Sequence, residues 1–210
     1  MNRNSPATAF DIRKPNWNNT DIFPDCIYID TNAVLEMVIP GRTYGSETKD
    51  YVSELINRNG IVTWSPFVVA ELYDFYQYYY NNTNGKIVGQ SPKDFENAAD
   101  KLNSTRVGLL VSKKVADTQR FLNTIGVPLE VSNMDEIMFK SNDILTQYGN
   151  NIKDANHIAV CFENGINDIL THDAKHGNGM LRYDGMNVYG ASNGIVSNYS
   201  STNKRNVINF

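Results

Sequence analysis

The chain has 210 residues, of which 41% are hydrophobic and 20% charged, the composition of an ordinary globular protein. No apolar run approaches the ~20 residues of a membrane span, and the N-terminal residues lack the apolar segment of a signal peptide, so we expect a cytoplasmic protein with no membrane partner. The formal net charge of −4 argues against a nucleic-acid partner, unless the acidic residues gather at a metal site whose ions offset them.

The first half of the chain is predicted to contain an irregular arm, two strands and several helices. Residues 1–24 are polar and contain three prolines, so we expect them to form the arm. The apolar run Cys26–Ile29 predicts a buried strand that ends at Asp30, and Ile61–Trp64 predicts a second strand. Ser65-Pro66 then predicts a helix N-terminus. In chain order, a short helix is expected from about residue 33, followed by helices at 48–59, 66–80, 92–102 and 107–122. A loop is expected at 81–89.

The second half is predicted to add strands separated by helices. Val127–Val131 predicts a third strand, and the Ser132–Asp135 segment resembles a capping box that begins a helix ending near Gly149. Asn151 is expected to cap the next helix, which ends at Gly165. The remaining strands are expected at 168–171 and 188–190, and residues 198–210 are expected to form a polar tail.

Strands that alternate with helices predict an α/β fold, with three layers and a mostly parallel central sheet of four to five strands. The domain is expected to cover residues 25–197, with extra helices around 74–122. The sequence contains no internal repeat, and it has no linker rich in proline, glycine or serine that would indicate a second domain.

Four acidic residues fall at predicted strand ends and on predicted helices. Asp30 and Asp173 follow two strands, whose ends would lie ~4.8 Å apart if the strands are neighbours. Ligands bind beyond such carboxyl ends in parallel sheets. Glu71 lies in the helix after the second strand, and Asp154 lies in the first turn of its helix. The sequence therefore predicts that these four acids can meet at one edge of the sheet.

Carboxylates held close together repel one another, and a hard divalent cation such as Mg²⁺ or Mn²⁺ removes that repulsion. Two such ions can bind a phosphodiester, activate a water and stabilise the leaving oxygen. Each acid alone also has a structural explanation: Asp30 as a helix cap, Glu71 as a solvated helix residue, Asp154 as an acid favoured by the helix dipole, and Asp173 as a turn residue. The prediction of a metal site therefore depends on their joint placement.

The joint pattern resembles the PIN-domain nucleases. The matching segments lie at residues 27–32, 65–72, 154–159 and 170–173, and the resemblance covers about residues 26–190. It implies a PIN-like fold in which Asp30, Glu71, Asp154 and Asp173 coordinate Mg²⁺ or Mn²⁺. Asn32 and Thr171 stand where the family has supporting polar residues.

The resemblance also implies a function. Many relatives are endonucleases that act on single-stranded RNA, including toxins of bacterial toxin–antitoxin pairs, so it implies an RNA substrate, an antitoxin partner and a homodimer. This chain is longer than the compact toxins in residues 1–24, 74–106 and 191–210. Our first hypothesis is a metal-dependent endoribonuclease. The alternatives are a catalytically silent PIN-like binding or scaffold module and a structure-specific DNA nuclease.

Several other side chains are candidates for secondary roles. His157 lies one helical turn after Asp154, where it can support a metal-bound carboxylate or the substrate, or make only structural contacts. His172 and His176 flank Asp173. His176, Lys175 and Arg182 can contact phosphate or belong to a solvated loop.

Two further groups have structural alternatives as well. Aromatic side chains of the tyrosine-rich helix can stack on unpaired bases, although helical spacing favours packing in a core or an interface; they are Tyr73, Tyr76, Tyr78, Tyr79 and Tyr80. Lys113, Lys114 and Arg120 can bind RNA phosphates or form a solvated helix face. Cys26 and Cys161 are expected to be free, buried thiols.

Overall fold

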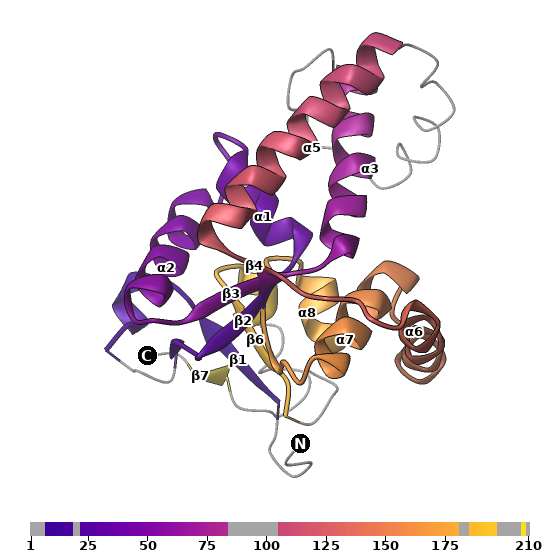
Figure 1. The fold of residues 1–210 in the computed structure, drawn as a ribbon. Helices are drawn as coiled ribbons and strands as arrows, with labels where there is room; N and C mark the ends of the chain where they lie inside the picture. The colour runs from indigo at the N-terminus through magenta and orange to yellow at the C-terminus, as the bar shows by residue number, and fades with distance from the viewer. Residues whose placement is uncertain (1–6, 19–21, 84–104, 181–184, 197–206, 209–210) are drawn as a thin grey trace.

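The computed structural model describes residues 7–18, 22–83, 105–180, 185–196 and 207–208 (Figure 1). The strands are β1 (Thr8–Asp11), β2 (Cys26–Ile29), β3 (Ile61–Trp64), β4 (Gly126–Pro128), β5 (Asp168–Leu170), β6 (Asn187–Gly190) and β7 (Val207–Ile208). The helices are α1 (Thr31–Val38), α2 (Gly45–Asn57), α3 (Pro66–Thr83), α5 (Thr105–Ile125), α6 (Met134–Tyr148), α7 (Ile152–Glu163) and α8 (Ala174–Met180), with a short 3-10 helix at Lys14–Asn16.

The strands form one parallel sheet in the order β4-β3-β2-β5-β6-β1-β7. The chain passes from β2 through β3 to the β4 edge, and then returns to β5 on the other side of β2. Because crossovers between parallel strands are right-handed, this reversal places the connecting helices on opposite faces. The boundary between β2 and β5 is therefore a topological switch point, where open α/β sheets bind their ligands.

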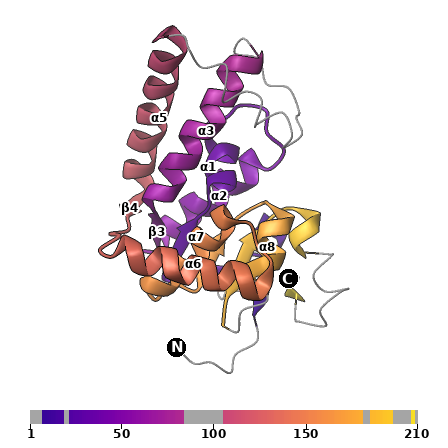
Figure 2. The same cartoon turned by 90° about the vertical axis from the view of Figure 1, so that its right-hand side faces the viewer.

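Helices cover the sheet in the expected three layers. Helices α1 and α2 lie on one side, and α6, α7 and α8 lie on the other (Figures 1 and 2). Helices α3 and α5 pack against each other and extend beyond the sheet edge at β4 (Figure 1). The central strands supply fully buried side chains such as Ile27, Ile29 and Leu170, as strands covered on both faces require. The predicted α/β fold with a parallel sheet is confirmed.

Among the residues that the structure describes, the sheet has seven strands, whereas the sequence predicts four to five. The prediction of an irregular arm at residues 1–24 is wrong at Thr8–Asp11, because this segment pairs with β6 in register Thr8↔Asn187. The prediction of a polar tail is wrong at Val207–Ile208, which pairs with the outer side of β1. Both strands form through partners distant in sequence, so the local polar composition does not reveal them.

Smaller differences concern element ends. Strand β4 stops at Pro128 rather than at residue 131, because its partner strand β3 ends at Trp64, opposite Pro128. Asn151 caps α7 as predicted. Helix α6 is capped one residue later than the Ser132–Asp135 box predicts, because Asn133 accepts from Glu136 N–H. The helix predicted over 92–102 lies outside the described residues. None of the helices in the described ranges combines the length and apolar character that a membrane crossing requires.

Candidate metal centre

Asp30 occupies the carboxyl end of β2 at the switch point. Its backbone continues the sheet, since its N–H donates to the carbonyl of Leu170 at 3.0 Å. It also stands at the N-cap position of α1, but its side chain makes no capping hydrogen bond. The carboxylate is instead 5% exposed and accepts a 2.7 Å hydrogen bond from Thr171 Oγ1 at Oδ2. The simple helix-cap explanation of Asp30 is therefore wrong.

Glu71 approaches Asp30 from the second turn of α3. The Oε1 atom lies 3.3 Å from His157 Nε2, and the side chain is 21% exposed. Burial by itself raises the pKa of Glu71, but the hydrogen bond and charge of His157, with a smaller contribution from Lys153, lower it to about 2. Glu71 is therefore a carboxylate held toward the sheet and not a solvated helix residue.

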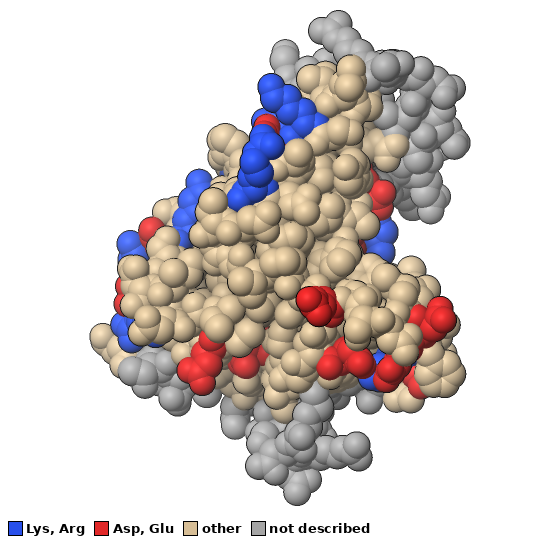
Figure 3. All heavy atoms as spheres, viewed as in Figure 1, with Lys and Arg blue, Asp and Glu red and all other residues tan. Residues whose placement is uncertain are grey.

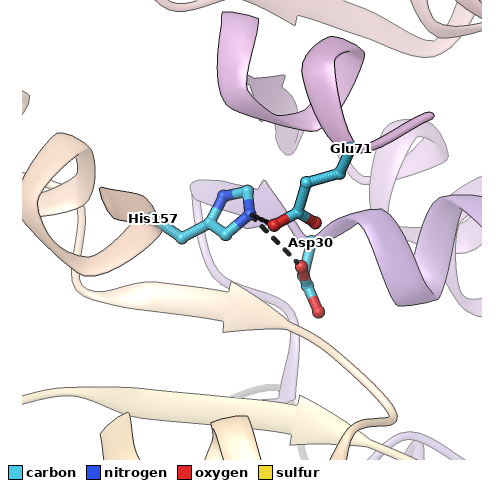
Figure 4. Close-up of side chains that lie close together, drawn as sticks. All are labelled: Asp30, Glu71 and His157. Carbon is cyan, nitrogen blue, oxygen red and sulfur yellow. Dashed lines mark ion pairs between the residues drawn. The ribbon is translucent and has the colours of Figure 1, made fainter. Parts of the chain in front are cut away.

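His157 is directed at both carboxylates (Figure 4). Its Nε2 lies 3.3 Å from Glu71 Oε1 and 3.8 Å from Asp30 Oδ1. On the other side of the ring, Nδ1 lies 2.6 Å from the Tyr28 hydroxyl, and that hydroxyl lies 2.7 Å from Ser65 Oγ. If the buried Tyr28 donates to Nδ1, then Nε2 carries the proton that faces Glu71. This chain of contacts fixes the orientation of the imidazole.

Asp154 is anchored at the start of α7. Its N–H donates to Asn151 Oδ1 at 2.9 Å, and its Oδ2 accepts from Asn151 Nδ2 at 2.7 Å. Its Oδ1 lies 3.1 Å from Nδ1 of the buried His176. Burial by itself lowers the pKa of His176, but the hydrogen bond to Asp154 and the charges of Asp30, Asp154 and Asp173 raise it to about 9. The imidazolium therefore offsets part of the local negative charge.

Asp173 is the most exposed of the four acids and directly precedes α8. Its Oδ1 accepts from the backbone N–H groups of Lys175 and His176, at 2.8 and 3.1 Å. Its own N–H donates to Thr171 Oγ1 at 3.1 Å, the same hydroxyl that holds Asp30. Thr171 therefore links the carboxyl ends of β2 and β5.

The four predicted acids line one cavity of about 230 Å³. Their elements also bring Asn32, Asp74, Lys153 and His176 to its wall. Ligand atoms of Asp30, Glu71 and His157 all lie within 4.8 Å of one another, whereas Asp154 and Asp173 stand outside this tight group. The structure thus brings all four acids to one space and gathers two of them closely.

The donor set suits a hard cation. Carboxylate oxygens are the ligands that Mg²⁺ and Mn²⁺ prefer. The ion-pair partners that the described part of the chain provides for Asp30, Glu71 and Asp154 are histidines. In addition, Asn32 Oδ1 is buried and has no hydrogen-bond partner among the described residues. A buried acceptor without a donor is costly, so a cation or its water shell fits this position.

Sequence reasoning missed two features of the cavity wall. One is the contact between His176 and Asp154, because the sequence suggests a phosphate contact or a solvated loop for His176. The other is an ion pair between Asp74 of α3 and Lys153 of α7, which joins two helices across the cavity. The spacing Asp173-x-x-His176 was a usable signal, because it places the histidine in the first turn of a helix that begins after Asp173.

The remaining candidates from the sequence are His172, Arg182 and the two cysteines. His172 is a structural residue, because its Nδ1 accepts from Ala191 N–H and its Nε2 lies 2.7 Å from Thr48 Oγ1. Burial together with the charge of Arg42 lowers the pKa of His172 to about 4. Arg182 lies outside the described residues. Both cysteines are free as predicted, but only Cys161 is buried, while Cys26 is half-buried.

The sequence matches a known family over most of its length. The PIN-domain model matches residues 27–178, and the chain belongs to this family. A search of curated proteins gives no significant match. Among solved structures, Mycobacterium tuberculosis VapC20, a toxin that cleaves the sarcin–ricin loop, is 16% identical, with 71% of this chain and 92% of that chain covered and a TM-score of 0.42. FitAcB from Neisseria gonorrhoeae is 14% identical, with 78% of this chain and 96% of that chain covered and a TM-score of 0.43.

Proposed function

We propose that this protein is a metal-dependent endoribonuclease that hydrolyses RNA phosphodiester bonds with Mg²⁺ or Mn²⁺. The observation that carries the proposal is the arrival of four carboxylates, from four separate elements, at one cavity on the switch point of the sheet. Membership of the PIN-domain family supports the nuclease chemistry and the choice of RNA. The toxin role, the antitoxin partner and the homodimer stay predictions from the family resemblance.

Asp30, Glu71, Asp154 and Asp173 would hold the metal. When bound there, Mg²⁺ or Mn²⁺ supplies positive charge that polarises the phosphodiester and makes a neighbouring water more acidic. The chain's own residues fix the geometry. Thr171 orients Asp30, Asn151 orients Asp154, and Tyr28 orients His157, which can donate to Glu71 from Nε2.

The proposal predicts metal binding and metal-dependent cleavage together. Titration calorimetry of the purified protein with Mn²⁺ should show a binding event, and a labelled single-stranded RNA should be cut internally with Mg²⁺ or Mn²⁺ but not with EDTA. A DNA strand of the same sequence serves as the comparison. Equal or preferential cutting of DNA would favour the structure-specific DNA nuclease, and the absence of both Mn²⁺ binding and cleavage would favour the silent binding module.

Replacing Thr171 tests how Asp30 is held. In Thr171→Val the hydroxyl that bonds Asp30 and accepts from Asp173 N–H is lost, so we expect Mn²⁺ affinity and cleavage to fall by about 10- to 100-fold, the usual cost of removing a ligand's hydrogen-bond partner. Thr171→Ser keeps the hydroxyl and should retain most of both. If valine and serine behaved alike in calorimetry and in the cleavage assay, Thr171 would have no positioning role.

A further inference from the structure

A second cavity, of about 270 Å³, lies between helices α1, α3 and α5 and outside the acidic site. Three aromatic side chains of α3 and one ammonium group of α5 contribute to its wall. It is lined by Val38, Ile39, Pro40, Tyr76, Tyr79, Tyr80 and Lys114. We call it the tyrosine pocket. Its wall is apolar and aromatic, with a single positive charge among these seven side chains.

Aromatic ring contacts connect the wall of the tyrosine pocket with the wall of the acidic cavity. Phe75 lines the acidic cavity, and its ring stacks on that of Tyr79, with centroids 6.2 Å apart and an interplanar angle of 27°. Tyr79 in turn meets Tyr80 edge-on, with centroids 5.3 Å apart. The aromatic surface that begins beside Glu71 and Asp30 therefore continues along α3 into the tyrosine pocket.

The tyrosines do not all share this role. Tyr76 is 6% exposed, and its hydroxyl lies 3.0 Å from Thr118 Oγ1, so it packs α3 against α5. Tyr80 also packs against the core. Tyr73 is 44% exposed and lies outside the pocket wall. Tyr79 is the half-buried ring that joins the two cavities.

The size and chemistry of the tyrosine pocket indicate what kind of group can bind in it. At about 270 Å³ it falls just below the ~300 Å³ at which drug-sized ligand sites begin, and it is too small for a helix ~10 Å across. A single planar ring system fits this space. Aromatic walls stack on nucleic-acid bases regardless of sequence, and positive side chains contact the neighbouring phosphates. Basic side chains follow the exposed side of α5, which carries Lys113, Lys114 and Arg120 (Figure 3).

We propose that the tyrosine pocket stacks one unpaired base of the RNA strand that is cut at the acidic cavity, with Lys114 on its phosphate; this inference rests on the proposed function. Tyr79 follows Glu71 by eight residues along α3, which corresponds to about 12 Å at 1.5 Å per residue. At the ~3.4 Å rise of stacked bases, the base held there lies about three to four nucleotides from the cut, or fewer in an extended strand. The pocket therefore selects single-stranded substrates over duplexes.

The test measures base stacking without relying on cleavage. Single-stranded RNA oligonucleotides carry 2-aminopurine at successive positions and are titrated with the Asp30→Asn protein in Mg²⁺, so that no cutting is expected. One position near the cut site should show quenched fluorescence. Adding Tyr79→Ala should remove that quenching and weaken RNA binding by about 5- to 150-fold, the size of one lost base–aromatic stack. Lys114→Gln should weaken binding and reduce its salt dependence.

Two variants outside the pocket serve as matched controls. On α3, Tyr73→Ala removes an exposed tyrosine that does not line the pocket. For the charge, Lys49→Gln removes an exposed lysine of α2 that does not line the pocket. If Tyr79→Ala bound RNA as tightly as Tyr73→Ala, or if no RNA binding occurred, the base pocket would be overturned. The pocket would then suit an apolar side chain of a protein partner. Position-specific quenching that depends on Tyr79, in a protein whose parent form does not cleave RNA, would support the pocket and refute the nuclease.

Discussion

The Asp30→Asn variant is expected to lose RNA cleavage by more than about 100-fold, comparable with the loss of a principal electrostatic group in other active sites. The amide keeps the size of the side chain and can still accept from Thr171 Oγ1, but it removes the charge that lies beside Glu71 and His157. Because that charge is buried near other acids, its loss should leave the metal-free protein as stable as before, or more stable.

Thermal unfolding with and without Mn²⁺ separates the metal from the fold. A ligand at 100 times its Kd adds about 2.7 kcal/mol to the free energy of unfolding, which is roughly 5–10 °C in Tm for a chain of this size. The parent protein should show this shift, and Asp30→Asn should not. Asp143→Asn, an exposed acid on α6, is the matched control and should behave like the parent. Cleavage retained by Asp30→Asn in a preparation free of other nucleases would refute the site.

The second large effect is expected from Gly190→Ala at the end of β6. A Cβ atom at this position would lie 2.3 Å from the carbonyl oxygen of Thr171 and 2.8 Å from Ile195 Cδ1. Because the first of these atoms belongs to the backbone of the neighbouring strand end, it cannot rotate away. We expect the free energy of unfolding to fall by about 3 kcal/mol, at the upper end of the usual cost of overpacking. Cleavage should fall as well, because Thr171 also holds Asp30.

Denaturant unfolding monitored by circular dichroism measures this loss. Gly108→Ala supplies the control, since a Cβ there meets nothing within 4 Å and the residue lies exposed in α5. Alanine is favoured over glycine in a helix, so the control should gain up to about 1 kcal/mol. If Gly190→Ala unfolded at the same denaturant concentration as the parent, the contact between β6 and the end of β5 would not be as close as described.

The sequence predicts the parts of the fold whose signals are local. Cys26–Ile29 and Ile61–Trp64 are short apolar runs and form β2 and β3 as predicted. Asn151 caps α7, and Gly149 takes the left-handed conformation after α6, at φ 66°. The sequence does not predict strands β1 and β7, because each forms by pairing with segments that are distant in the sequence.

The candidate site also has parts that the sequence predicts and parts that it does not. Asp30 and Asp173 were placed correctly because parallel strand ends lie together, and all four acids line one cavity. The position of Glu71 depends on how α3 leans over the sheet, which periodicity does not determine. The pairing of His176 with Asp154 joins the first turns of α8 and α7, so it follows from the packing of two helices and not from either one.

The pairing of β1 with β6 and β7 has a consequence for how the protein is made. Phe10 lies beside both Tyr189 and Ile208 in the sheet, so this edge joins residues from opposite ends of the described sequence. Contacts of such large sequence separation form slowly, and on the ribosome they wait until nearly all of these residues have been synthesised. Strand β5, which leads to Thr171 and Asp173, borders the same late-forming half of the sheet. If the proposed function holds, chains that stop before β6 and β7 should therefore be nuclease-inactive.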